Sequence, residues 1–232
     1  MRNFAVISVI LLLGWTVPVH ADLTIVQRVE GATQNGDVTV KIKGDKERID
    51  APSQPTRIID GKTGEMTDLM NDRKSFLKIS AGQIKAATES MNQLNAGKQL
   101  TPPKLTPTGK KDTINGYEAE EYAYETPQFK AAFWIATKYP GATDILKQMQ
   151  APISGAWKPS NMGLPDYTDF TGLPLKTVIT VGTDQVVTTI VSIKQDAVNA
   201  SEFEIPKDFQ ELKELIRSAP ESATSPSGSP TP

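Results

Sequence analysis

Two short motifs could supply a serine nucleophile, since Ser75–Lys78 (SFLK) matches S-x-x-K and Lys62–Gly64 (KTG) matches K-T-G. In that chemistry a lysine one helical turn after the serine activates its hydroxyl. Here Ser75–Lys78 lies in an alternating pattern typical of a strand, and residues three apart in a strand point to opposite faces. The order of the two motifs is also reversed, and an S-D-N motif is missing. We therefore predict a strand at Ser75–Lys78 and a turn at Lys62–Gly64.

Glutamates near residue 120 are the other candidates for catalysis, since a pair of carboxylates can hydrolyse a glycosidic bond. We expect them to be solvated, because strand alternation places Glu118 and Glu120 together on one polar face. The sequence has no cysteine, and its one histidine, His20, lies in a segment expected to be removed. Imidazole and thiolate catalysis, and zinc sites built on those ligands, are then excluded. We expect no catalytic residue, metal or cofactor, with carboxylate catalysis by Asp or Glu as an open alternative.

The N-terminus carries the features of an export signal. Arg2 precedes an apolar run from Phe4 to Val19, and small residues fit signal peptidase cleavage after Ala21. No other apolar run is long enough to span a bilayer, and without cysteine there is no residue for lipoprotein acylation. The 25 basic and 27 acidic residues give no argument for binding nucleic acid. We expect a protein of the bacterial periplasm, or a secreted one, with residues 1–21 as a cleaved signal peptide.

Short alternating segments indicate one α+β domain over residues 22–218, followed by a disordered tail rich in proline and serine at 219–232. We expect helices at 81–96 and 142–150, and a third near the end with Asp208 and Glu211 as a capping pair. The proline-rich stretch from Thr101 is expected to be a loop. Strands are predicted at 23–30, 37–43, 47–50, 56–60, 65–70, 75–79, 117–124 and 129–137, and in a hairpin at 175–194.

The hairpin Leu175–Lys194 (LKTVITVGTDQVVTTIVSIK) carries apolar residues on both faces. We expect Gly182–Gln185 to join its two strands. Across the hairpin, Val187 is expected to share a face with Ile179, while Val178 points to the other face. An antiparallel sheet with one wet face needs only one apolar face. Both faces of this hairpin therefore need a cover.

The connection 151–174 is long and holds its own apolar side chains, as lids and packed loops do. Among these are Trp157, Met162, Leu164, Tyr167 and Phe170. An apolar ligand could lie between such a lid and the two-sided strands. The residues that we expect to line this site are Phe133, Trp134, Trp157, Val178, Ile179, Val181, Ile190 and Val191.

Several segments resemble an uncharacterised family of exported bacterial proteins known as a domain of unknown function. These are VTVKIKGDKERIDAP, TRIIDGKTGEM, NGYEAEEY, FWIAT, GLPLKT and VSIKQDAVNASEFEIPKDF, and they cover most of residues 22–210. More distantly, the layout is similar to LolA-type and LolB-type lipoprotein carriers. That resemblance implies an α+β fold, in which a curved antiparallel sheet (an incomplete barrel) has a few helices over its concave face. In LolA-type carriers an arginine near the second strand holds the lid, and Lys43 and Arg48 lie nearest to that place.

We therefore expect a non-enzymatic periplasmic binding or carrier protein for a hydrophobic ligand. The resemblance implies a lipid or acyl chain as ligand and a lipid or lipidated protein as partner. The alternative is a cell-envelope interaction or scaffold module, whose helices fill the curved sheet and whose partner is an envelope protein. We expect no stable membrane insertion after cleavage.

Overall fold

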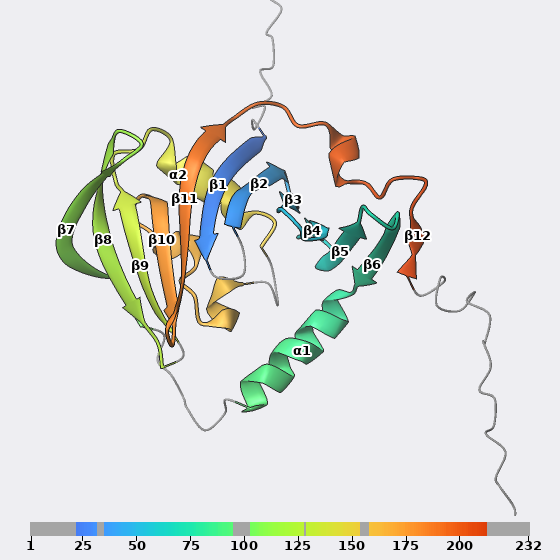
Figure 1. Ribbon diagram of the computed structural model, residues 1–232, viewed down its shortest axis with the longest axis horizontal. Coiled ribbons are helices and arrows are strands. Elements are labelled where there is room, and N and C mark those ends of the chain that lie inside the picture. Colours follow the sequence, from blue (N-terminus) through green and yellow to red (C-terminus); the bar gives the residue numbers. More distant parts are fainter. Residues whose placement is uncertain (1–21, 32–34, 95–102, 128, 154–157, 213–232) are drawn as a thin grey trace, which may run out of the picture.

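A single open sheet forms the body of the molecule (Figure 1). The computed structural model describes residues 22–31, 35–94, 103–127, 129–153 and 158–212. The strand order is β12-β6-β5-β4-β3-β2-β1-β11-β10-β9-β8-β7, and all neighbours are antiparallel except β12 and β6. β7 and β12 lie at opposite ends and do not pair, so the sheet does not close. The α+β class with an incomplete antiparallel barrel is confirmed.

Two meanders build this sheet and meet where β1 pairs with β11. The first comprises β1 (Leu23–Gly31), β2 (Asn35–Lys43), β3 (Lys46–Asp50), β4 (Thr56–Asp60), β5 (Glu65–Met70) and β6 (Ser75–Ile79). The second comprises β7 (Thr106–Ile114), β8 (Tyr117–Glu125), β9 (Lys130–Ala136), β10 (Leu173–Val181) and β11 (Asp184–Lys194). The remaining elements are α1 (Ala81–Leu94), α2 (Ala142–Gln150), η2 (Pro159–Met162), η3 (Tyr167–Asp169), η4 (Ala200–Phe203) and β12 (Gln210–Glu211).

The helix α2 covers one face of the sheet, which we call the inner face. Its buried residues recur at spacings of three and four, which gives a helix one apolar stripe; they are Ala142, Ile145, Leu146 and Met149. This stripe belongs to the same buried cluster as Leu23 and Ile42. Because Leu23 of β1 pairs with Ile42 of β2, their side chains share a face. The predicted helix at 142–150 is confirmed, and it holds the inner face at the centre of the sheet.

The helix α1 follows β6 and extends away from the sheet (Figure 1). Ile84 is buried with Ile59 and Met66, whereas Ala87 is exposed. The prediction of a helix over 81–96 is confirmed as far as Leu94, and its last two residues lie outside the described ranges. Within the described residues, no helix has the length and apolar character needed to cross a membrane.

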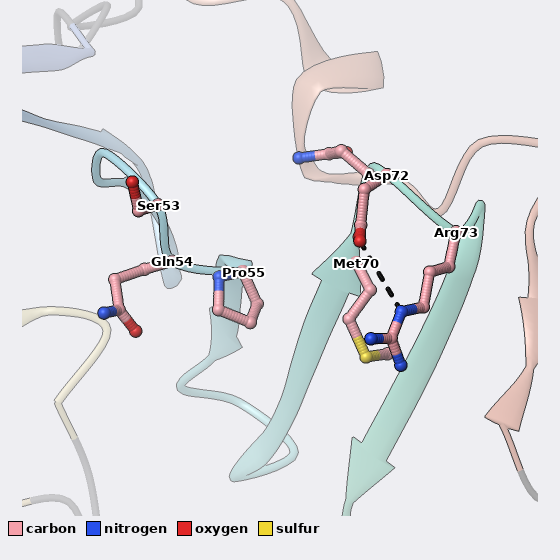
Figure 2. Close-up of a pocket in the computed structure, with 7 residues that line it drawn as sticks. Ser53, Gln54, Pro55, Met70, Asp72 and Arg73 are labelled. Carbon is pink, nitrogen blue, oxygen red and sulfur yellow. Dashed lines mark ion pairs between the residues drawn. The ribbon is translucent and has the colours of Figure 1, made fainter.

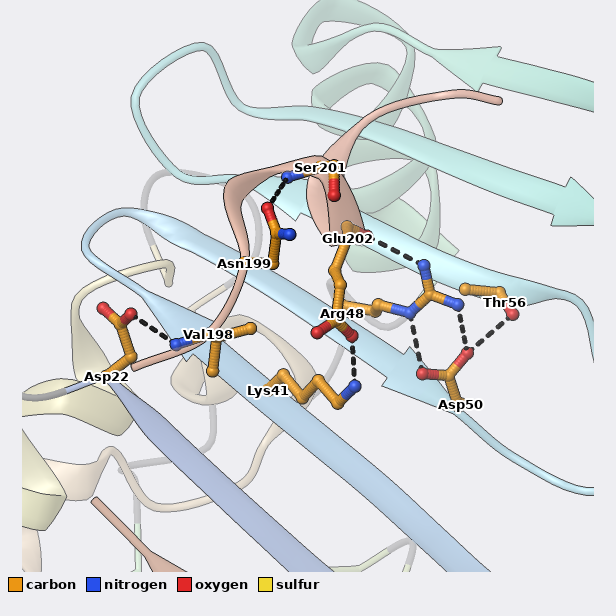
Figure 3. Close-up of polar contacts among 9 residues, drawn as sticks. All are labelled: Asp22, Lys41, Arg48, Asp50, Thr56, Val198, Asn199, Ser201 and Glu202. Atoms are coloured by element: carbon orange, nitrogen blue, oxygen red, sulfur yellow. Dashed lines mark hydrogen bonds and ion pairs between the residues drawn. The ribbon is translucent and has the colours of Figure 1, made fainter. Parts of the chain in front are cut away.

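The opposite, outer face is covered by residues 195–209, which we call the strap. Val198 and Phe203 of the strap are buried in one cluster with Ile58 and Leu69. Figure 3 shows the polar contacts that hold the strap on β2 and β3. The Asp22 carboxylate accepts from the Val198 backbone N–H at 2.8 Å. The chain itself therefore fills this face of the first meander.

Three cations of β2 and β3 bind the strap: Lys41 pairs with the Glu202 carboxylate, and Lys43 and Arg48 bind backbone carbonyls. Lys43 Nζ donates to the Val198 carbonyl at 2.9 Å, and Arg48 donates to the Glu202 carbonyl at 2.8 Å. Arg48 is in turn held by Asp50 through contacts of 2.7 and 2.9 Å. Lys43 and Arg48 thus bind the outer strap, on the face of the sheet opposite to α2.

A strand replaces part of the proline-rich loop expected from Thr101. Thr106–Ile114 pairs with β8 as β7, with an irregularity after Pro107. Proline is tolerated at a sheet edge and next to a bulge, because its missing N–H faces no partner there. Glu121, expected to be solvated, is buried and accepts from Lys110 and Thr108, each at 3.1 Å. The sequence did not predict the edge strand β7, and it therefore did not predict that Glu121 of β8 is buried.

The closing hairpin has a register other than the expected one. Gly182, with φ of +59°, and Thr183 form a two-residue turn, so Val181 pairs with Asp184. Val187 consequently pairs with Val178 rather than lying on the face of Ile179, which pairs with Val186. The expectation was wrong because a tight turn sets the register of a hairpin.

The third expected helix does not begin at Asp208. The Asp208 carboxylate pairs with Lys74 at 2.9 Å, and Glu211 pairs with Phe76 as part of β12. Phe209 packs on the outer cluster, and that contact brings the chain alongside the edge of β6. Residues 213–232, like the expected signal peptide 1–21, lie outside the described ranges, and the predicted domain boundaries stay predictions.

Candidate ligand-binding cleft

A cleft of about 650 Å³ opens between α2 and the segment around η3. Its apolar wall on the helix is formed by Ala142 and Leu146, and the facing wall by Tyr167 and Phe170. Tyr139 lines the turn that leads into α2. The volume lies within the range of about 300–1,000 Å³ that is common for small-molecule sites.

Local backbone geometry positions both walls. Gly141 has φ of +70°, a left-handed conformation that glycine adopts without strain, and it lets the chain turn into α2. At Gly172, an added Cβ would lie 2.5 Å from Thr137 Cα and 2.6 Å from the Ala136 carbonyl oxygen. The end of the η3 segment can approach the end of β9 so closely only because residue 172 has no side chain.

Aromatic contacts stiffen the wall that faces α2. The ring centroids of Tyr167 and Phe170 lie 6.5 Å apart, and Phe170 meets Phe133 edge-on at 5.2 Å. Such aromatic pairs stabilise packing beyond the area that they bury. The Asp166 backbone N–H donates to Asp169 Oδ2 at 2.9 Å, which fixes the turn of η3. The cleft therefore has one helical wall and one aromatic wall braced by β9.

Gln150, at the end of α2, brings an unsatisfied acceptor to the cleft lining. Its Oε1 is buried without a hydrogen-bond partner among the described residues, while its Nε2 donates weakly to the Ile153 carbonyl at 3.5 Å. A buried acceptor without a partner is destabilising. A donor group on a bound molecule would be a favourable partner for this oxygen.

The phenol groups of the cleft lie in an environment that favours their neutral form. Burial raises the pKa of Tyr167, and the negative charge of Glu47 raises it further. Burial likewise raises the pKa of Tyr139, with a smaller contribution from Tyr117. Burial also raises the pKa of Glu47 to about 7. Neutral tyrosines add no charge to the cleft wall, which suits contact with the apolar part of a ligand.

The residues expected to line a ligand site from sequence are dispersed. Phe133 is buried in a cluster with Tyr124, and Ile179 packs against that cluster. Ile190 belongs instead to the cluster under α2, and Trp134, which packs on the same cluster, carries Lys176 Nζ 4.8 Å from its ring centroid.

Three further expected lining residues, Val178, Val181 and Val191, belong to neither group. Val178 is half-buried, whereas Val181 and Val191 are 55% and 46% exposed. Trp157 lies outside the described residues. Phe133 touches the cleft wall through Phe170, and the other described residues of the expected set are not among those that line the cleft.

Sequence reasoning indicated the lid-like connection that contributes Tyr167 and Phe170, but it missed the α2 wall. The signal that could have found Leu146 is the apolar stripe of α2, which was interpreted only as packing. Tyr139 carries no local pattern that points to a cleft. Its position depends on the contact of its ring with Tyr117, 4.6 Å between centroids.

A second hollow, of about 570 Å³, lies between the β3–β4 and β5–β6 turns (Figure 2). Ser53, Pro55 and Met70 line it, together with Asn71. Its inner polar group is already satisfied, because Asn71 Nδ2 donates to Thr56 Oγ1 at 3.1 Å. This hollow offers less apolar surface than the cleft, and none of its described lining residues has a buried side-chain atom without a partner, so we take the cleft as the candidate site.

The motifs that suggested chemistry have structural roles. Ser75 is fully buried in β6, whereas Lys78 pairs with Glu65 at 3.1 Å, so the two side chains do not meet. Residues 62–64 form a turn in which Asp60 accepts two backbone N–H groups at 3.0 Å. The expected strand and turn are confirmed. In the described ranges, no group of three or more acidic, histidine or cysteine side chains could hold a metal ion.

Comparison with known proteins identifies relatives without a described activity. Residues 23–209 match a family model described as a domain of unknown function (DUF4412). No curated protein sequence matches the chain.

Three solved structures illustrate the similarity in shape. PNGF-II has a TM-score of 0.41 and 16% identity over 85% of this chain, which spans only 33% of the PNGF-II chain. The lipoprotein LppX of Mycobacterium tuberculosis has a TM-score of 0.41 and 12% identity, covering 78% of this chain and 90% of LppX. LprF of Mycobacterium bovis has a TM-score of 0.35 and 11% identity, covering 82% of this chain and 90% of LprF.

Proposed function

The chain belongs to the DUF4412 family, and we propose that it is a non-enzymatic binding or carrier protein of the bacterial periplasm. Its ligand is hydrophobic, a lipid or an acyl chain. The observation that carries this proposal is the cleft of about 650 Å³ between the apolar stripe of α2 and the aromatic wall at η3. An apolar molecule gains about 25 cal/mol for each Å² of surface removed from water, which is the main driving force such a site can offer.

The experiment compares ligand binding by the full chain with binding by a variant whose cleft is filled. Thr143 is exposed on α2 and lines the cleft, so Thr143→Trp adds bulk to the cleft without disturbing the buried stripe. Ser90→Trp places the same side chain on the exposed surface of α1 and serves as the matched control. Binding is measured by titration with a fluorescent fatty acid and by native mass spectrometry of the purified protein.

We expect wild type and Ser90→Trp to bind the fatty acid equally and Thr143→Trp to bind it at least about tenfold more weakly. Native mass spectrometry of the wild-type protein should show the added mass of a bound lipid. Organic extraction of the same protein should release that lipid. A protein that purifies without bound lipid and binds no fluorescent fatty acid contradicts the proposal.

A second candidate, an envelope interaction or scaffold module, is favoured by the tight filling beneath α2. Leu23 and Ile145 are 0% and 2% exposed there, so the helix meets the sheet directly at that point. This candidate predicts no bound lipid, and a defined protein partner on cross-linking in cells. The exposed surface of α1 would then be the first place to search for that contact.

A further inference from the structure

An in-register row of side chains crosses the inner face of the first meander. Direct pairs in antiparallel strands place their side chains on the same face. The successive pairs from β1 to β6 join Leu23, Ile42, Glu47, Ile59, Met66 and Ile79. Five of the six are apolar, and Glu47 is the only charged member of this row.

The apolar neighbours of Glu47 are deeply buried. Ile42 is 2% exposed and belongs to the cluster under α2, and Ile59 is 7% exposed and packs with Ile84 of α1. Glu47 lies between these two clusters and is itself half-buried. A carboxylate between two apolar clusters is costly unless a partner neutralises it.

The Glu47 side chain has no hydrogen bond or ion pair within the described part of the chain. The cations on β2, β3 and β4 already have partners: Lys41 with Glu202, Lys43 with Asp22, Lys46 with Asp60, Arg48 with Asp50 and Arg57 with Asp68. Lys41 and Lys43 flank Ile42 in sequence and so point to the outer face, away from Glu47. Each described cation of β2, β3 and β4 thus has a partner other than the Glu47 carboxylate.

Glu47 is electrostatically linked to the wall of the cleft. Its charge acts on the phenol of Tyr167, which lines the cleft and packs on the cluster under α2. The loop that joins α2 to η2 also comes close, since Pro152 backbone atoms would lie 2.5 Å from a Cβ at Gly61, next to β4. The loop and η3 thus bring the cleft near the inner face of β3 and β4.

We propose that Glu47 binds the cationic group of an amphiphilic ligand of the alkylammonium class, whose apolar part occupies the cleft between α2 and η3. This proposal rests on the proposed function. An ammonium group would supply both the missing countercharge and hydrogen-bond donors for the carboxylate, and charge-assisted hydrogen bonds are the stronger kind. Because the proton and the ammonium group compete for the carboxylate, binding should strengthen as the pH rises through about 7.

Other titratable groups lie near Glu47 or line the cleft. From α2, Asp144 and Lys147 line the cleft and pair with each other at 3.7 Å. From β4, Arg57 shares the inner face and is paired with Asp68 at 2.8 Å. From η3, Tyr167 is neutral, and Asp169 accepts from the Asp166 backbone N–H. From β2, the residue that faces Glu47 is Ile42. A pH dependence of ammonium binding near pH 7 that disappears with Glu47 is therefore assigned to this carboxyl group.

The test uses decylammonium and decanol, two probes with the same alkyl chain, below their micellar concentrations. Isothermal titration calorimetry on the full chain measures both affinities at pH 5.5 and pH 8 for wild type, Glu47→Gln and Glu125→Gln. Glu125 is an exposed strand glutamate paired with Lys130, so its variant is the matched control.

At pH 8 we expect wild type and Glu125→Gln to prefer decylammonium over decanol by about tenfold or more. In wild type the preference should shrink at pH 5.5, and in Glu47→Gln it should be absent at both pH values with decanol affinity unchanged. Equal preference in wild type and Glu47→Gln, or equal binding of the two probes by wild type, overturns this proposal and leaves the proposed function standing. Binding of neither probe overturns this proposal, and the proposed function falls with it when the fluorescent fatty acid and bound lipid are absent as well.

Discussion

Replacing Glu47 by glutamine should make the folded protein more stable at neutral and alkaline pH. The burial that raises the pKa of Glu47 from its ordinary value of 4.5 to about 7 means that the folded state holds this proton more tightly than the unfolded state does. Glutamine has nearly the same shape and carries no charge to desolvate. The substitution therefore removes a destabilising ionisation and leaves the neighbouring Ile42 and Ile59 contacts in place.

The magnitude and sign follow from the two pKa values. Below pH 4.5 the carboxyl group is protonated in both states and contributes nothing. Between pH 4.5 and 7 only the unfolded state loses the proton, so wild-type stability falls as the pH rises. Above pH 7 the group is ionised in both states, and the full penalty is about 3 kcal/mol, since each pKa unit corresponds to about 1.4 kcal/mol.

The assay is urea denaturation of wild type and Glu47→Gln from pH 4.5 to pH 8. We expect nearly equal free energies of unfolding at pH 4.5, and a variant more stable by up to about 3 kcal/mol at pH 8. Other titrating groups are shared and cancel in the difference. Glu125→Gln should show no such change with pH. A Glu47→Gln variant that is equally stable or less stable than wild type at pH 8 would refute the reasoning that this carboxylate is desolvated and unpaired.

Two further substitutions test the packing of the strap and of the cleft wall. Phe203→Ala should lower the free energy of unfolding by about 3–5 kcal/mol, because Phe203 is 5% exposed in the outer cluster. Val191→Ala, at a residue 46% exposed, is the control and should lower it by less than about 1 kcal/mol. Chemical denaturation measures both values. Gly172→Ala should lower it by about 1–3 kcal/mol and weaken fatty acid binding, because the new Cβ would meet the Thr137 backbone at 2.5 Å. Gly82→Ala, in the first turn of α1, would place its Cβ 3.9 Å from Ser80 Oγ, an ordinary contact, and should leave both measurements unchanged or slightly raise stability. A Gly172→Ala protein with wild-type stability and binding would show that the close approach is not needed.

The two faces of the first meander have different covers, and this bears on function. The outer face is closed by the strap, whose Val198 and Glu202 are bound by Lys43 and Arg48 through several direct contacts. The inner face carries instead an unpaired carboxylate in an apolar row, near a cleft with an unsatisfied acceptor at Gln150. Among the described residues, the Glu47 carboxylate and Gln150 Oε1 indicate where a ligand can add stabilising contacts.

Local periodicity was sufficient for most elements of the fold. The alternation in Leu23–Gly31 and the apolar stripe of Ala142–Gln150 each describe one face of one element. Residues within the segment are therefore sufficient to predict the strand or the helix. Composition likewise predicts no imidazole or thiolate chemistry, a prediction that depends on removal of the segment that holds His20. The strand character of Ser75–Ile79 followed in the same way and argued against a serine-lysine pair.

Tertiary structure alone decided the site. Nothing in the local sequence distinguishes Glu47 from its paired neighbours on β3, because its isolation depends on which residues β2 and β4 place beside it. The contact between Tyr167 and the cluster under α2 joins segments far apart in the chain, and β7 is a strand only because β8 offers it an edge. Burial and unpaired charge are properties of long-range neighbours, and sequence periodicity reports only on the residues adjacent in the chain.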